Sequence, residues 1–261
     1  MTRGVSRSVL ILAACLLAAH VRALGQDTTY STIGILVSAG LGTAGGTGNE
    51  EAFLRAGGFA MGRGDLLPKR NGTTLLIAAD YRITKRFAAG LAFATLGGYF
   101  TEEPNLYAFR QTPDPYVTVK STQTSDGYYL YGAWYILTTP REEHSPNVRV
   151  AAGIGASRIA VNTSFGDDWN AVWTGDNVAK VSRAYTRPSA LLLVTAGLPL
   201  GPALSIGASV GYRYVTDLDI AEETVAYPVK YPDPRTVRFT MPAHTVGYSS
   251  SMFGGYLELR L

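Results

Sequence analysis

Cysteine is almost absent from this chain, and its single cysteine, Cys15, lies near the N-terminus. A disulfide scaffold is therefore excluded, so the stability of the fold has to come from burial and hydrogen bonding. Charged residues are also scarce, at 16% of 261 residues, while 46% of the residues are hydrophobic. That composition excludes wholesale disorder, and one compact domain is the default at this length.

The first 25 residues are typical of a cleaved secretory signal peptide. Arg3 and Arg7 form a positive n-region, an apolar run covers residues 9–19, and residues 23–25 place small side chains around a cleavage site. The apolar run is too short to cross about 30 Å of hydrocarbon as a helix. An uncleaved anchor and acylation at Cys15 are the alternatives.

Loss of the signal peptide leaves a chain without cysteine and with balanced charge. The sequence has 23 basic and 20 acidic residues, and Arg3, Arg7 and Arg22 lie in the signal peptide, which leaves 20 of each. The formal net charge of +3 therefore belongs to the export signal. The mature chain has no basic footprint of the kind that binds nucleic acid.

After residue 26 the dominant pattern is strict alternation between large apolar residues and small or polar residues, which is typical of strands. In residues 148–157, Val148, Val150 and Ile154 share one face, and arginine, alanine, glycine and serine share the other. Residues 86–93 and 204–214 repeat the pattern. Because the second face is mostly small rather than charged, it fits a crowded barrel lumen better than a solvated surface.

This alternation predicts eight strands, each about as long as the 9 to 11 residues that cross a bilayer with a tilt, or longer. The predicted strands are Tyr30–Thr43, Thr73–Tyr81, Arg86–Phe100, Thr124–Leu137, Val148–Ser164, Thr186–Gly197, Leu204–Asp217 and Thr245–Leu261. In hydrocarbon every backbone polar group needs an internal partner, so strands of this kind must close into a barrel.

The connections between the predicted strands alternate in length, as in outer-membrane barrels with short periplasmic turns and long outside loops. The short ones are residues 82–85, 138–147 and 198–203, and the long ones are 44–70, 101–123, 165–185 and 218–244. The sequence therefore predicts an all-β fold over residues 26–261, a closed antiparallel up-and-down transmembrane β-barrel with both termini in the periplasm. Ten strands are the alternative, if residues 51–63 or 225–241 add a hairpin rather than extending strands above the membrane.

The chain ends on an amphipathic strand in which Phe253, Leu257, Leu259 and Leu261 alternate with polar residues. This resembles the C-terminal insertion signal of outer-membrane barrels, although Leu261 stands where that signal usually has an aromatic residue. The eight-strand plan resembles the OmpA, OmpX and OmpW group of outer-membrane proteins. The resemblance implies a location in the outer membrane of a Gram-negative envelope, contact with its lipid and insertion by the barrel-assembly machinery.

Six charged residues fall on predicted inward faces of the strands. They are Asp80, Arg86, Arg149, Glu258 and Arg260 near the periplasmic end, and Arg213 nearer the outside. A charge that faces lipid would cost about 2–4 kcal/mol at the midplane, so inward placement is favoured and opposite charges there can pair. We predict a structural ion network that closes the lumen, with a gate or selectivity ring as the sharper alternative.

Aromatic residues are numerous in the predicted loops. They are Tyr107, Phe109, Tyr116, Trp169, Trp173, Tyr227 and Tyr231. Tyrosine and tryptophan anchor many binding surfaces, so these residues are candidates for contact with a ligand or partner. Packing of the loops onto one another and contact with lipid headgroups are the alternatives. Tyr81 and Tyr135, near periplasmic strand ends, are expected in the interfacial girdle.

Patterns that would indicate catalysis or cofactor binding are weak. Residues 40–45 fit a dinucleotide-binding glycine pattern, but no alternation of strands and helices follows it. Asp167, Asp168 and Asp176 lack the spacing of a calcium loop. We therefore expect no cofactor and no metal.

Two histidines remain after removal of the signal peptide, His144 in a turn and His244 at the start of the last strand. His244, followed by Ser249, Ser250 and Ser251, allows a lipid acyl hydrolase or transferase as a remote alternative. The leading hypothesis is a non-enzymatic outer-membrane barrel with a structural or surface-contact role. A conduit or binding protein for a small hydrophobic compound is the main rival, because eight strands leave room for packed side chains or one small ligand.

Overall fold

The computed structural model describes residues 33–44, 71–84, 86–96, 105–109, 117–137, 146–166, 179–201, 203–229, 235–241 and 243–261. Every regular element within these ranges is a strand, and none of them contains a helix long and apolar enough to span a membrane. The predicted signal peptide, residues 1–25, lies outside the described residues.

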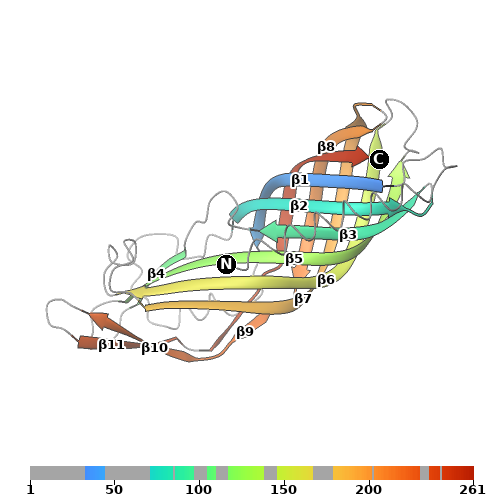
Figure 1. The fold of residues 1–261 in the computed structure, drawn as a ribbon. Coiled ribbons are helices and arrows are strands. Elements are labelled where there is room, and N and C mark those ends of the chain that lie inside the picture. Colours follow the sequence, from blue (N-terminus) through green and yellow to red (C-terminus); the bar gives the residue numbers. More distant parts are fainter. Residues whose placement is uncertain are drawn as a thin grey trace.

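Eight long strands form the main sheet, and each overlaps one of the eight predicted segments. They are β1 (Ile33–Ala44), β2 (Asn71–Arg82), β3 (Phe87–Leu96), β5 (Val117–Leu137), β6 (Asn147–Gly166), β7 (Ala179–Pro199), β8 (Leu204–Val215) and β13 (Ser250–Arg260). The strand order is β3-β2-β1-β13-β8-β7-β6-β5, and β3 also pairs with β5, so the sheet closes on itself (Figure 1). Closure removes the open edges that a sheet otherwise exposes, and it confirms the predicted antiparallel up-and-down ring of eight strands.

The alternative of ten strands is wrong for residues 225–241. These residues form the hairpin of β10 (Glu223–Val229) and β11 (Arg235–Met241), which is a separate two-stranded sheet and does not enter the ring. Residues 51–63, the other candidate hairpin, lie outside the described residues.

The two ends of the ring differ. At the end that we call basal, β2 and β3 are joined by a tight turn in which Thr84 Oγ1 accepts hydrogen bonds from the backbone N–H groups of Arg86 and Phe87. The chain ends here as well, because the Leu261 N–H donates to the carbonyl oxygen of Ile33 at 2.9 Å. The basal end therefore carries the short turns and the last residue, as the alternation of connection lengths predicts.

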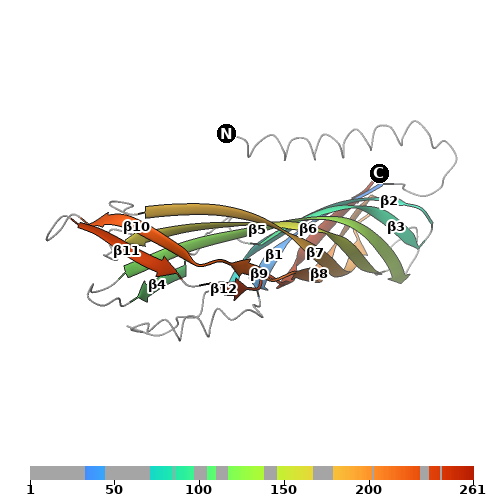
Figure 2. The same ribbon diagram turned by 90° about the horizontal axis from the view of Figure 1, so that it is seen from below.

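At the opposite, distal end, β5, β6 and β7 are 20 or 21 residues long and continue past their neighbours. The last pairing of β5 with β3 is at Ser125, and the last pairing of β7 with β8 is at Ser189. Beyond these points the three strands and β4 (Asn105–Phe109) form a projecting sheet, which we call the distal sheet (Figures 1 and 2). The outer parts of β5 and β7, residues 117–123 and 179–185, lie in the predicted long connections 101–123 and 165–185, so the prediction of loops there is wrong.

Candidate functional site

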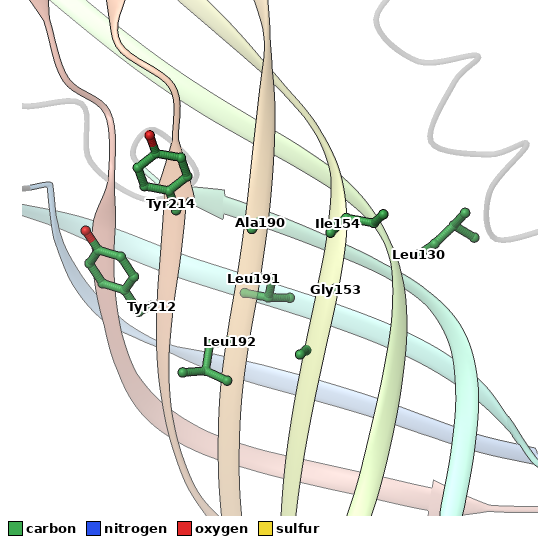
Figure 3. Close-up of a pocket in the computed structure, with 9 residues that line it drawn as sticks. Leu130, Gly153, Ile154, Ala190, Leu191, Leu192, Tyr212 and Tyr214 are labelled. Carbon is green, nitrogen blue, oxygen red and sulfur yellow. The ribbon is translucent and has the colours of Figure 1, made fainter.

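The outward face of the ring is apolar over a band that we call the belt. It runs from Tyr128 to Ile136 on β5 and from Leu204 to Tyr214 on β8, and no described strand of the ring places a charged side chain outward at this level. Leu41, Leu130 and Ile154 in the belt are 67–74% exposed, which would be costly in water for so continuous a surface. A shallow depression in the belt crosses β5 to β8 (Figure 3).

Aromatic side chains lie at both edges of the belt. Phe87 and Trp134 pack at the basal edge with ring centroids 6.3 Å apart, and Phe93 and Tyr128 pack at the distal edge with centroids 5.2 Å apart. Tyr81 is 43% exposed at the basal edge, as expected for a girdle residue. Paired aromatic girdles that flank an apolar band are the pattern of a transmembrane barrel.

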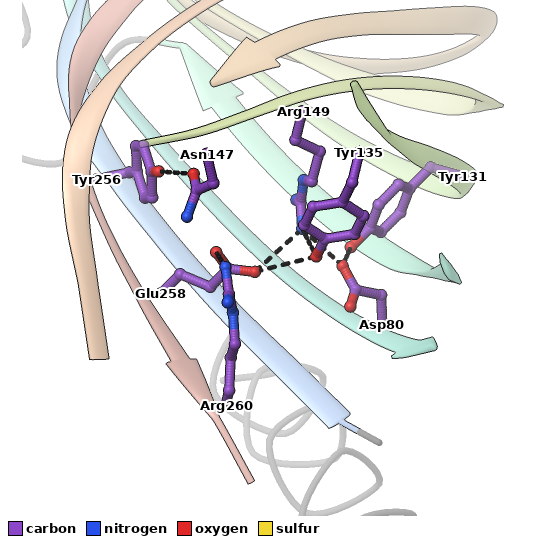
Figure 4. A network of polar contacts seen from close by, with 8 residues as sticks. All are labelled: Asp80, Tyr131, Tyr135, Asn147, Arg149, Tyr256, Glu258 and Arg260. Atoms are coloured by element: carbon purple, nitrogen blue, oxygen red, sulfur yellow. Dashed lines mark hydrogen bonds and ion pairs between the residues drawn. The ribbon is translucent and has the colours of Figure 1, made fainter. Parts of the chain in front are cut away.

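The lumen near the basal end is filled by a group of buried polar side chains centred on Arg149 of β6 (Figure 4). Arg149 Nη1 lies 2.8 Å from Asp80 Oδ2 of β2 and 3.5 Å from Glu258 Oε1 of β13. The other carboxylate oxygen of Glu258 lies 3.1 Å from Arg260 Nη2. We call Asp80, Arg149, Glu258 and Arg260 the basal ion network; Arg149 links β6 to strands on other sides of the ring.

Two tyrosines of β5 donate hydrogen bonds to the carboxylates of this network. The Tyr131 hydroxyl donates to Asp80 Oδ2 at 2.6 Å, and the Tyr135 hydroxyl donates to Glu258 Oε1 at 3.2 Å. The guanidinium of Arg82 lies 4.4 Å from the ring centroid of Tyr135. Each carboxylate thus has a cationic and a hydroxyl partner, which buried charges require if they are to be stable.

The expectation that Tyr135 belongs to the outer girdle is wrong. Its side chain is 2% exposed and points inward, because it shares the inward parity of Tyr131 while Trp134 takes the outward position. Nearness to the strand end suggested the girdle, but the alternation of faces decides the direction. The same alternation predicts two inward residues that the sequence analysis missed: Arg82, two positions after Asp80, and Asn147, two positions before Arg149.

The predicted charged residues do not all lie together. Asp80, Arg149, Glu258 and Arg260 form one network, whereas Arg86 is exposed in the turn between β2 and β3. The prediction that Arg86 belongs to the buried network is wrong, because its side chain is exposed in the basal turn, directly before β3 begins at Phe87. Arg82, on the preceding strand, contacts the network instead.

Arg213 of β8 lies alone near the distal end of the lumen and is fully buried. Its Nη1 donates to the backbone carbonyl of Ser125 at 2.8 Å and to that of Ala94 at 3.4 Å. These carbonyls belong to β5 and β3, on the far side of the ring from β8. The lumen is therefore spanned at two levels by arginine side chains.

Between these levels, other inward side chains contact one another inside the ring. The hydroxyls of Ser38 on β1 and Ser209 on β8 are 2.6 Å apart, although β13 lies between their strands. The Tyr256 hydroxyl donates to Asn147 Oδ1 at 3.0 Å, and its ring covers Gly207, where an added Cβ would lie 2.7 Å from Tyr256 Cε1. Small residues on one strand thus make room for tyrosine on the next.

A second apolar cluster, which we call the distal core, covers the inward positions at the distal end of β6 and β8. It contains Ile159, Val215, Leu218, Ile220 and Tyr248. Leu218 and Ile220 belong to β9 (Leu218–Ile220), which pairs with β12 (His244–Val246). Val161 and Tyr185 of the distal sheet pack against this cluster, so the projecting strands and the ring share a core.

Two of the three serines in the remote catalytic hypothesis, Ser249 and Ser250, are buried in the fold, while Ser251 is half-buried. Ser249 Oγ accepts a hydrogen bond from the Val215 N–H and donates to the Val215 carbonyl, and Ser250 is fully buried. His244 lies in β12, and its side chain is outside the described residues, as is His144. An acyl-transfer nucleophile would need an accessible hydroxyl, and neither Ser249 nor Ser250 offers one.

The dinucleotide pattern in residues 40–45 is also structural. β1 continues through it as a strand, and a Cβ on Gly40 would collide with the carbonyl oxygen of Phe253 on the paired strand. The described ranges hold no group of three or more residues able to bind a metal, and Asp167, Asp168 and Asp176 lie outside those ranges.

The predicted interaction aromatics fall on the distal side of the ring or outside the described residues. Tyr107 and Phe109 lie in β4 and Tyr227 lies in β10, and nothing is described of their side chains. The others, Tyr116, Trp169, Trp173 and Tyr231, lie outside the described residues.

No family model and no curated protein matches this chain. Several solved structures have a similar arrangement of strands. Neisserial surface protein A has 12% sequence identity and a TM-score of 0.43, and the match covers 90% of this chain and 100% of that chain. The outer membrane protein OprG from Pseudomonas aeruginosa has 10% identity and a TM-score of 0.43, with 89% and 98% covered. A major outer membrane protein from Thermus thermophilus has 14% identity and a TM-score of 0.44, with 88% and 99% covered. These are outer-membrane and surface proteins, of the kind that the sequence resembles.

Proposed function

We propose that this chain is a non-enzymatic outer-membrane β-barrel protein whose lumen is sealed and whose distal sheet makes contacts outside the cell. The observation that carries the proposal is the inversion of polarity around the ring. Charged side chains such as Arg149 and Arg213 point inward and are buried, while the belt is uncharged and exposed. A protein dissolved in water has the opposite arrangement, whereas a barrel in lipid requires this one.

The orientation follows from the two ends of the ring. Short turns belong to the periplasmic side of outer-membrane barrels and long connections to the outside, which places the basal end in the periplasm and the distal sheet outside. Cysteine labelling on intact cells tests this orientation, because an introduced thiol is unique once Cys15 leaves with the signal peptide. Thr236→Cys in β11 should react with a membrane-impermeant maleimide, and Thr84→Cys in the basal turn should react only after permeabilisation. The reverse result would overturn the orientation.

We infer that the basal ion network and the distal core seal the lumen. Arg149 and Arg213 cross it at two levels, and Ser38 and Ser209 meet between them. In planar bilayers the purified protein should therefore show no reproducible conductance steps, with a wide porin as the positive control. Regular steps for the unmodified protein would favour a gate or conduit instead.

A conduit for a small hydrophobic compound would need an open path through the lumen. The side chains of the basal ion network and of Arg213 occupy that path. A lipid-modifying enzyme would need a reactive group at the rim. In a strain that makes the His244→Ala variant, we expect membrane lipids identical to those made with the unmodified protein, and an altered lipid pattern would revive the enzymatic hypothesis.

The surface role rests on the distal sheet. Its strands continue past the ring and are supported by the distal core, and an ion pair between Arg183 of β7 and Glu223 of β10 ties the hairpin to it. Such a supported platform outside the membrane suits contact with another molecule, because little of it has to become ordered on binding.

We further propose that the barrel-assembly machinery recognises the last strand. β13 pairs with both β1 and β8 and therefore closes the ring. Removal of the last three residues, 259–261, should reduce insertion into the outer membrane, measured by fractionation. An equal yield of inserted protein would argue against this signal.

A further inference from the structure

The depression in the belt lies where small outward residues interrupt a run of large ones. Two neighbouring cross-strand rows form it: Leu130, Ile154, Ala190 and Tyr214 in one, and Ala152, Leu192 and Tyr212 in the other. Ala190 stands between Ile154 and Tyr214 (Figure 3). Ala152 is paired with Leu192, so larger side chains flank both alanines. We call this depression the belt groove.

The belt groove has a volume of about 370 Å³ and an almost entirely apolar lining. The backbone of Gly153 and Leu191 forms part of its floor. Its polar atoms include the hydroxyls of Tyr212 and Tyr214, and both phenol groups point along β8 toward the distal end (Figure 3). The groove therefore has an apolar body and a hydroxyl-bearing distal end.

Beyond that distal end, the outward face turns from apolar to charged. Arg158 is exposed on the same face of β6 as Ile154, four positions further along the strand, or roughly 13 Å at the rise of an extended chain. Asp126 and Thr186 are its paired neighbours on β5 and β7. Among the described strands this row is the first above the belt with outward charge, one acidic and one basic side chain, so it lies at the level of lipid headgroups if the belt spans the hydrocarbon.

We infer that the belt groove holds one acyl chain of a phosphate-bearing lipid of the outer leaflet, with Arg158 binding the phosphate. The inference rests on the proposed membrane location, which makes lipid the solvent of the belt. An apolar chain fills the space beside Ala190 and Ala152, the two tyrosine hydroxyls lie at the chain's polar end, and the guanidinium complements the negative charge. Elsewhere in the belt lipid exchanges freely, whereas this lipid stays bound.

Native mass spectrometry of the purified, signal-processed protein in detergent tests the inference. The probes are dimyristoyl phosphatidic acid and dimyristoyl glycerol, which share acyl chains and differ in the phosphate. We expect one phosphatidic acid per protein and at least tenfold less retention of the glycerol. Equal retention of both probes, or none of either, would overturn the inference.

Two substitutions separate the chain contact from the phosphate contact. Ala190→Phe fills the groove and should reduce retention of phosphatidic acid at least tenfold, whereas Ala208→Phe, an exposed belt position outside the groove, should leave it unchanged. Arg158→Gln should lower retention of phosphatidic acid to that of the glycerol. If Ala190→Phe does not fold, Ala152→Leu takes its place; full retention in a folded, groove-filled variant refutes the site.

Failure of this inference differs from failure of the proposed function. A protein that needs detergent to stay in solution but retains no lipid loses only the belt groove. A protein that stays in solution without any amphiphile loses the membrane location, and the groove with it.

Discussion

Replacement of Arg149 by methionine is the sharpest test of the filled lumen. The substitution keeps an unbranched apolar side chain of similar reach but removes the cation that lies 2.8 Å from Asp80 and 3.5 Å from Glu258. Glu258 then keeps the ion pair with Arg260. Asp80 keeps the hydrogen bond from the Tyr131 hydroxyl but loses Arg149, its cationic partner in the basal ion network.

Removing one member of a buried ion pair costs about 3–5 kcal/mol, or roughly two to four orders of magnitude in the folding equilibrium. Urea unfolding in lipid vesicles, followed by the mobility of unheated samples on gels, measures the free energy of unfolding. Arg86→Met is the matched control, because Arg86 is exposed in the basal turn and its loss should change stability by no more than about 0.5 kcal/mol.

A double variant completes the test. Asp80→Asn together with Arg149→Met removes both charges of the closest pair, so its loss of stability should be smaller than the sum of the two single losses by about 0.5–3 kcal/mol. If Arg149→Met proves no more destabilising than Arg86→Met, the basal ion network does not stabilise the barrel and the reasoning fails.

Further substitutions test the belt and the packing of tyrosine on glycine. Ile154→Arg puts a charge on an outward position that is 74% exposed and should destabilise the vesicle-bound protein by about 2–4 kcal/mol in urea unfolding; unchanged stability would mean that lipid does not touch it. Gly207→Ala should cost about 1–3 kcal/mol by the same measurement, because the new Cβ would collide with the backbone carbonyl oxygen of Ala196 on β7 and would lie 2.7 Å from the Tyr256 ring. Gly201→Ala is its control, since a Cβ there meets nothing within 4 Å, and equal losses for the two glycines would contradict the packing argument.

The sequence predicts the ring well because alternation is a local property. In β6 the even-numbered positions, such as Val148, Val150 and Ile154, are apolar, and Arg149 occupies an odd-numbered position. The two faces of β6 can therefore be assigned without knowledge of any partner strand. Each short turn then fixes the pairing of the two strands that it joins, apart from a shift of register between Tyr135 and Leu137 where β5 pairs with β6.

What lies beyond the ring was less predictable. The distal parts of β5 and β7 are held by each other and by the distal core, which joins Ile159 to Leu218 and Tyr248 from distant parts of the chain. The alternation in these segments is short and mixed with polar residues, as in Val117, Val119 and Lys120 of β5, and their burial depends on partners far away in the sequence. The sequence alone therefore predicts loops over residues 117–123 and 179–185.

The basal ion network was likewise predictable in part, namely in which faces its residues occupy. Parity placed Asp80, Arg149 and Glu258 on inward faces, which is where they lie. Parity alone does not predict the exposure of Arg86, because this residue lies in the basal turn at the edge of the ring, although its carbonyl oxygen already accepts a hydrogen bond from the Tyr135 N–H. The partner that each charged residue contacts depends on its position along the barrel axis. That position is set by the register between strands, some of which are far apart in the sequence.

A gel comparison of outer-membrane fractions tests the closed, lipid-facing ring most directly. Membranes from cells that make the full chain are solubilised in detergent, and each sample is run with and without boiling. The protein should be found only in the outer-membrane fraction, and its unboiled band should migrate differently from the boiled one, because the closed ring resists detergent until heated. Identical migration, or recovery of the protein in the soluble fraction, would contradict the ring and its belt together.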